Sequence, residues 1–133
     1  MLRAIPLLII VIAIWNVLVL VTGSELSAQA LSFAMPSGAT LTFTTANALV
    51  GIGLILLYLE ILKSTRTSAV SIIDHVLSMA LFVVALLEMI LVPEMSTGSF
   101  ALVVLLTLID VIAGFTVTIS TARRDIGLGD RIG

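Results

Sequence analysis

Three acidic side chains and one histidine occur inside long apolar stretches of this chain, where ionisable groups are rare. Asp110 lies near the centre of the last stretch, Glu88 lies toward one end of the preceding stretch, and Asp74 and His75 lie at its other end. An ionisable group inside a membrane is costly, so it usually marks an ion or proton pathway or a contact between helices. The spacing predicts a ladder of groups that could transfer protons or bind a cation.

Each of these residues also has a simpler interpretation, as a polar contact that holds two helices together. Asp110 could be protonated and hydrogen-bonded to a neighbouring helix, since protonation removes the cost of burying its charge. Glu88 lies at a depth where Asn47 could form a hydrogen bond with it, and Asn16 is a second residue suited to such contacts. For the pair Asp74 and His75, an interfacial capping role and a proton entry point both remain open.

These residues must be positioned by the apolar segments that contain them. The chain is 60% hydrophobic and only 11% charged, whereas a soluble domain has about 25% charged residues. Crossing a bilayer as a helix takes about 20 residues, and strands with open edges are excluded in lipid. We therefore expect an all-α integral membrane protein, a single four-helix antiparallel bundle whose spans are residues 4–22, 43–63, 70–92 and 99–120.

The positively charged residues predict how the bundle is oriented. All six fall at the same alternate ends of the four segments, and the other ends have none: Arg3, Lys63, Arg66, Arg123, Arg124 and Arg131. Because such residues accumulate on the cytoplasmic side, we expect both termini to be cytoplasmic, in a bacterial inner membrane. The first five of these side chains are expected to anchor the protein among lipid headgroups.

The connections between the segments give further expectations. Residues 23–42 form the longest one, an outer loop in which Ser24 could start a short interfacial helix that ends before Pro36. Residues 64–69 form a tight inner turn, which predicts that the second and third spans pack against each other. Residues 121–133 are expected to form a short cytoplasmic tail.

Several classes of function find no support in the composition. The chain has no cysteine and one histidine, so we expect no disulfide, no metal site and no cofactor. We find no serine–histidine arrangement that suits nucleophilic catalysis, and therefore expect no enzyme. Basic clusters interleaved with aromatic residues are absent, which argues against binding to nucleic acid.

Two hypotheses of function remain. No Lys or Arg is expected at the membrane depth of the acidic side chains. The acids must therefore be protonated, bind a cation, or be paired with a basic group from another chain. We therefore expect an accessory, assembly or scaffold subunit of a larger membrane complex, whose partners are lipids and other membrane proteins. The alternative is a small homo-oligomeric transporter or channel, coupled to protons or cations, with its pore between protomers.

Overall fold

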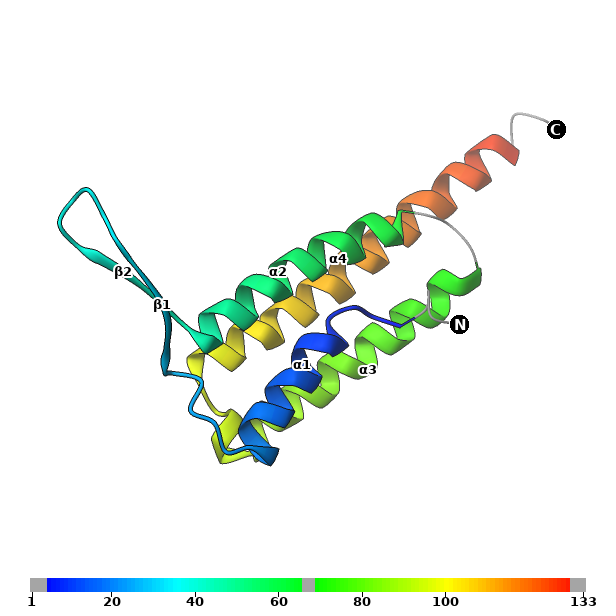
Figure 1. Cartoon of the computed structure of the whole chain (residues 1–133). Helices are drawn as coiled ribbons and strands as arrows, with labels where there is room; N and C mark the ends of the chain where they lie inside the picture. Colours follow the sequence, from blue (N-terminus) through cyan, green and yellow to red (C-terminus); the bar gives the residue numbers. More distant parts are fainter. Residues whose placement is uncertain (1–4, 66–68, 130–133) are drawn as a thin grey trace.

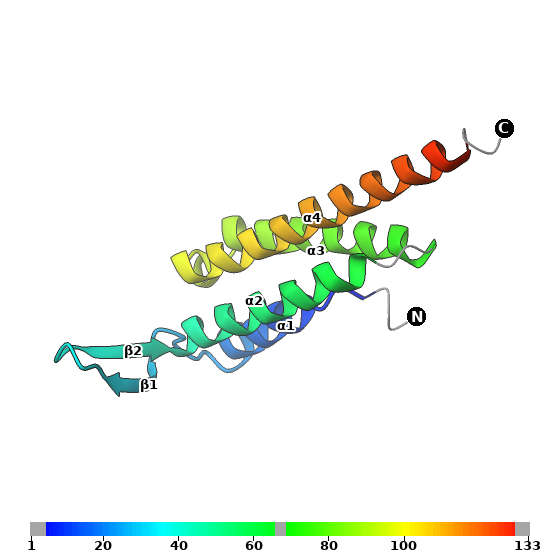
Figure 2. The ribbon, with the colours of Figure 1, turned by 90° about the horizontal axis from the view of Figure 1, so that it is seen from above.

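A computed structural model describes residues 5–65 and 69–129 of the chain as a bundle of helices with one β-hairpin (Figure 1). The helices form two layers, α1 with α2 and α3 with α4 (Figure 2). In chain order the elements are α1 (Ile9–Asn16), the π-helix η2 (Val17–Val21), β1 (Gln29–Ala34), β2 (Thr40–Thr44), α2 (Thr45–Ser64), α3 (Ala69–Leu91), the 3-10 helix η3 (Pro93–Met95) and α4 (Gly98–Gly129).

Three helices are long and apolar enough to cross a membrane. They cover Thr45–Ser64, Ile72–Leu91 and Gly98–Arg124, close to three of the four predicted spans. The first predicted span, 4–22, is longer than the helix found there, which covers only Ile9–Val21. Pro6 has no N–H to offer to a helix, and the amide of Leu7 binds a side chain of α2 instead, so the helix begins two residues later.

The chain is mostly helical, as expected, but the outer loop forms a β-hairpin and not the short helix predicted there. β1 and β2 pair in antiparallel fashion, with Leu31 opposite Phe43 and Phe33 opposite Leu41. Pro36 and Gly38 lie in the turn between them, where Gly38 has a φ of 82° and its N–H binds the Met35 carbonyl at 2.9 Å. Turn residues such as these, flanked by alternating apolar residues, are typical of a hairpin.

The helices pack through a core of large side chains and one close approach. Trp15 of α1 lies 5.3 Å from Phe100 of α4, measured between ring centroids, and both are buried. A Cβ atom placed on Gly53 of α2 would lie 2.8 Å from the end of the Leu106 side chain of α4, so a larger residue would require that side chain to move. α2 packs mainly on α4 and meets α3 through the Lys63–Asp74 ion pair, so the expected packing of the second span against the third is wrong.

The last helix extends well past the rest of the bundle (Figure 1). The predicted tail therefore continues α4 as far as Gly129. Arg123 and Arg124 are exposed on this extension, as a headgroup-anchoring role requires. Arg3 and Arg66, predicted to share that role, lie outside the described residues.

Candidate functional site

A buried polar cluster lies at the end of the bundle opposite the hairpin. It consists of five side chains from three helices: Glu60, Lys63, Asp74, Ser78 and Asp110. Four of them are buried, and Lys63 is the exception with 27% of its side chain exposed. Charged groups are seldom buried unless they are paired, so the contacts inside this cluster decide its chemistry.

Lys63 neutralises two of the acids. Its Nζ lies 2.9 Å from Asp74 Oδ1 and also forms an ion pair with Glu60. The same ammonium group donates a hydrogen bond of 3.2 Å to the Ile5 carbonyl. Glu60 and Lys63 are three residues apart on α2, a spacing that brings their side chains together on the helix surface. The expectation that no cation of this chain reaches the acids is wrong, because the long lysine side chain extends from the end of α2 to the neighbouring helix.

Glu60 has a structural role that the sequence analysis did not assign. It is 2% exposed, and its Oε2 accepts a 2.7 Å hydrogen bond from the backbone N–H of Leu7. A carboxylate is stabilised at this position because the start of a helix leaves N–H groups without partners. Leu49, Gly53 and Leu57 are buried with it on one face of α2. That helical spacing is the signal that could have identified Glu60 as an inward-facing residue.

Asp110 and Ser78 link α4 to α3 one turn deeper in the bundle. The Ser78 hydroxyl lies close enough to the Asp110 carboxyl group to interact with it. Ser78 follows Asp74 by one helical turn, and both are buried on the inward face of α3. The polar side chains of the cluster therefore lie in a row, from the partly exposed Lys63 through Asp74 and Ser78 to the buried Asp110.

His75 lies beside this cluster and binds α4 rather than the acids. Thr118 donates its hydroxyl hydrogen to the Gly114 carbonyl at 3.0 Å. Its oxygen also lies 2.6 Å from His75 Nε2, and in this second hydrogen bond either group can be the donor, depending on the tautomer of the imidazole. A Cβ atom on Gly114 would lie only 2.6 Å from His75 Nδ1, so the imidazole packs directly on the backbone of α4. This contact joins the two helices.

The remaining predicted polar residues lie toward the hairpin end of the bundle. Asn16 of α1 donates a 3.1 Å hydrogen bond to Glu88 of α3, and so forms a contact between helices, as expected. The expected bond between Glu88 and Asn47 is wrong. Asn47 instead forms a capping box with Thr44 at the start of α2, where its side chain accepts from the Thr44 N–H at 3.1 Å.

A mostly apolar layer separates the two polar regions, and the buried hydroxyl of Thr107 on α4, at its edge, is bonded to the Val104 carbonyl of its own helix. Ser78 and Glu88 are ten residues apart on α3, which corresponds to about 15 Å of helix. The inward positions between them are occupied by Leu81 and Ala85, both buried. Proton transfer along hydrogen bonds requires neighbouring polar groups, and this layer provides none in the described part of α3.

Metal binding and known relatives add nothing further to this site. Within residues 5–65 and 69–129, no group of three or more His, Cys, Asp or Glu side chains is arranged to hold a metal ion. Scans against protein-family models, curated proteins and solved structures found no match to this chain. The function must therefore be inferred from the geometry alone.

Proposed function

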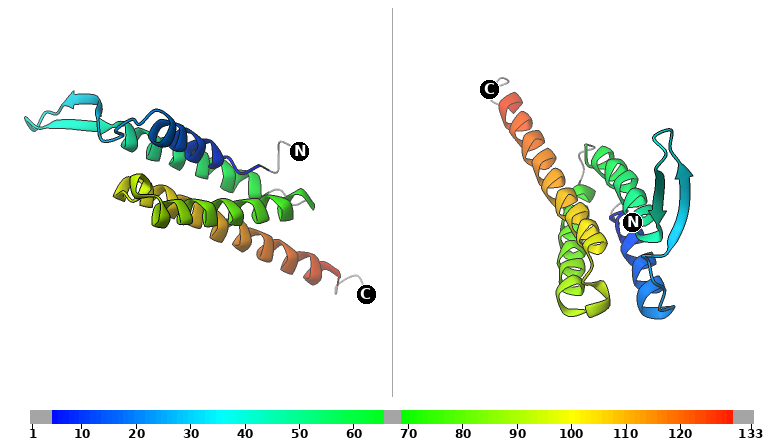
Figure 3. Two further views of the ribbon diagram at one scale, coloured as in Figure 1. Left: turned by 90° about the horizontal axis from the view of Figure 1, so that it is seen from below. Right: turned by 90° about the vertical axis from the view of Figure 1, so that its left-hand side faces the viewer.

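We propose that this protein is an accessory or scaffold subunit of a larger membrane protein complex, and that it binds its partner through the β-hairpin. The observation that carries this proposal is the shape of the hairpin, which projects away from the helices instead of packing on them (Figure 3). A two-stranded hairpin standing alone in water is only marginally stable. A partner that covers it would stabilise it.

One face of the hairpin is apolar and uncovered. The pairing register places four large side chains on this face, and all of them are exposed: Leu31, Phe33, Leu41 and Phe43. Phe33 and Phe43 meet edge to face, with their ring centroids 6.4 Å apart. The opposite face has small polar side chains, Ser32 and Thr42 among them. Exposed apolar clusters of this kind commonly mark sites of protein–protein contact.

The edges of the hairpin favour a protein partner over lipid. Strand edges leave N–H and C=O groups free, and monomeric proteins usually protect such edges with charged residues. Residues 29–44 contain no charged side chain. An uncharged ribbon with two free edges can add a strand from another protein, and main-chain hydrogen bonds would then supply affinity.

The proposal extends to location and orientation. Three helices of spanning length support an integral membrane protein. The described cations, Lys63, Arg123 and Arg124, lie away from the hairpin end (Figure 1). By the positive-inside rule the hairpin would then lie on the outer face of a bacterial inner membrane, with both termini cytoplasmic.

Replacing Phe33 and Phe43 together with Ser should release the partner. Each buried Phe contributes about 1.5–3 kcal/mol, so the double variant should bind at least about 100-fold more weakly. The measurement is extraction of the tagged protein from its native membrane in mild detergent, followed by quantitative mass spectrometry of the proteins recovered with it.

The matched control changes the opposite face of the same strands. Ser32→Ala with Thr42→Ala should leave the recovery of the partner unchanged, and a photo-reactive residue at position 33 should cross-link to the partner far better than one at position 42. Recovery of the unchanged protein alone, as a monodisperse species from native membranes, would contradict the proposal.

The alternative function is a homo-oligomeric proton- or cation-coupled transporter or channel. It is favoured by the row of side chains that can exchange protons, from Lys63 through Asp74 and Ser78 to Asp110. The apolar layer beyond Asp110 argues against a continuous path through one protomer, and the acids are buried inside the bundle rather than exposed where a second copy could share them. We therefore rank transport second.

Reconstitution distinguishes the two functions. In proteoliposomes containing a pH-sensitive dye, we expect the purified protein to give proton flux no greater than empty liposomes, and Asp110→Asn to change nothing. A flux that the unchanged protein supports and Asp110→Asn abolishes, with the variant still folded, would assign the function to transport.

A further inference from the structure

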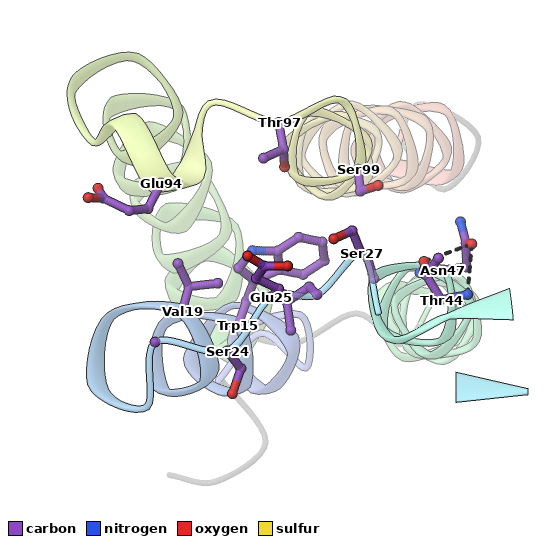
Figure 4. A pocket seen from close by; sticks show the side chains of 13 residues that line it. Trp15, Val19, Ser24, Glu25, Ser27, Thr44, Asn47, Glu94, Thr97 and Ser99 are labelled. Carbon is purple, nitrogen blue, oxygen red and sulfur yellow. Dashed lines mark hydrogen bonds between the residues drawn. The ribbon is translucent and has the colours of Figure 1, made fainter. Parts of the chain in front are cut away.

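A cavity of about 540 Å³ opens at the hairpin end of the bundle. It lies between η2, the segment 22–28, the start of α2, η3 and the start of α4 (Figure 4). Its size is within the range of small-molecule sites, about 300–1,000 Å³. The side chains that matter to its chemistry are Trp15, Glu25, Ser27, Glu94 and Ser99.

The Trp15 indole at the base of this cavity has an unused hydrogen-bond donor. Trp15 is 2% exposed and lines the cavity, while its ring packs on Phe100. Within the described residues, no carbonyl, carboxylate or hydroxyl accepts a hydrogen bond from its Nε1–H. The Nε1 atom is not among the enclosed side-chain atoms of the described residues that lack a partner, so this N–H is accessible from the cavity. An acceptor atom of a ligand in the cavity would supply its partner.

Glu25 supplies a negative charge to the wall of the same cavity. The carboxylate of Glu94, a second acid of the lining, lies at the rim in Figure 4 and is directed away from Trp15. Neither acid forms an ion pair with a described residue. The described cations are all at the other end of the molecule, so the cavity attracts a positively charged ligand.

We propose that this cavity binds the ammonium group of a small amino alcohol. The ammonium group would pair with the Glu25 carboxylate, and the hydroxyl oxygen would accept the free N–H of Trp15. Ser27 and Ser99 add hydroxyl groups to the wall. This two-point recognition requires both a cation and an acceptor in one small molecule, which a simple metal ion or an apolar ligand does not provide. The site is independent of the hairpin face and would function whether or not the protein belongs to a complex.

The single tryptophan of the chain makes the proposal directly measurable. Ethanolamine, titrated into the purified full-length protein in phosphatidylcholine nanodiscs, should produce a saturable change in Trp15 fluorescence. Ethylene glycol, which has the same size and hydroxyl group but no charge, should produce none, and neither should sodium chloride at equal ionic strength. A change that does not saturate, or that ethylene glycol reproduces, would overturn the proposal.

Two matched variants test the geometry. Glu25→Gln removes the charge at an exposed position, so the fold should persist while the affinity for ethanolamine falls at least about tenfold, as expected for a lost charge-assisted contact. Glu94→Gln makes the same chemical change at the rim and should alter the affinity much less. Equal affinity in the Glu25→Gln variant and the unchanged protein would exclude the site as drawn.

The same ammonium chemistry could come from a free amino alcohol or from a lipid headgroup. Nanodiscs that contain phosphatidylethanolamine separate these sources. If the headgroup occupies the cavity, these nanodiscs should shift Trp15 fluorescence before any titration and weaken the response to free ethanolamine, and Glu25→Gln should abolish that shift. If the response to free ethanolamine is unchanged in them, the ligand is the soluble molecule. An absent response in both kinds of nanodisc would refute the proposal.

Discussion

Replacing Lys63 with Met should lower the free energy of unfolding by about 3 kcal/mol, the cost expected when one partner of a buried ion pair is removed. The change leaves Glu60 and Asp74 buried without the cation that both contact. It also removes the hydrogen bond to the Ile5 carbonyl, and so weakens the attachment of the N-terminal segment. The measurement is unfolding of the purified protein in detergent micelles by titration with SDS, with Trp15 fluorescence as the signal.

Two further variants show whether charge is the cause. Lys63→Arg preserves the positive charge and should retain most of the stability. Adding Glu60→Gln and Asp74→Asn to Lys63→Met removes the buried charges together and should recover much of the loss, because neutral groups are less costly to bury. If Lys63→Met alone unfolds at the same SDS concentration as the unchanged protein, the buried polar cluster does not stabilise the bundle.

Replacing Gly114 with Ala should destabilise the bundle by about 1–3 kcal/mol, the usual cost of overpacking a core. The added Cβ would lie 2.6 Å from His75 Nδ1 and 2.7 Å from its Cε1. The imidazole cannot retreat without breaking its 2.6 Å hydrogen bond to Thr118. We expect α3 and α4 to separate locally, which the same SDS titration would register as an earlier transition.

Gly51→Ala provides the matched control on α2. A Cβ atom there would meet nothing within 4 Å, so the variant should be neutral or stabilising by up to about 1 kcal/mol, as alanine favours a helix over glycine. In a His75→Ala background the cost of Gly114→Ala should nearly vanish, since the colliding ring is gone. Equal effects of Gly51→Ala and Gly114→Ala would mean that His75 does not pack on α4 as described.

The structure changes how the two functional hypotheses compare. The acids were expected to need a cation from a partner subunit, but Lys63 of the same chain supplies one. A partner is indicated instead by the uncovered face of the hairpin, where Leu31, Phe33 and their cross-strand neighbours are exposed. The buried acids, by contrast, hold helices together. Asp110, for example, joins α4 to α3 through its contact with Ser78.

The sequence by itself determined the helices of spanning length and their inward-facing polar residues. Long apolar runs specify helices locally, because a helix satisfies its own backbone hydrogen bonds. The burial of Asp110 could also be predicted, because an acid near the centre of a spanning helix is costly to expose to lipid. The hairpin is also encoded locally, by the alternation of Leu31, Phe33, Leu41 and Phe43 around Pro36 and Gly38, although a capping serine followed by apolar residues had favoured a helix there.

Only the tertiary structure decided which polar residues meet. Glu88 accepts a hydrogen bond from Asn16 and not from Asn47. Likewise, α2 packs mainly on α4 and not on α3. These pairings depend on how the helices are arranged around one another, which short connections do not fix. Depth within the membrane can be counted along each helix, but the choice of neighbour depends on local packing, here on the close approach that Gly53 permits. The cavity beside Trp15 has the same origin, since its walls come from three separate stretches of the sequence, within 15–27, 44–47 and 94–99.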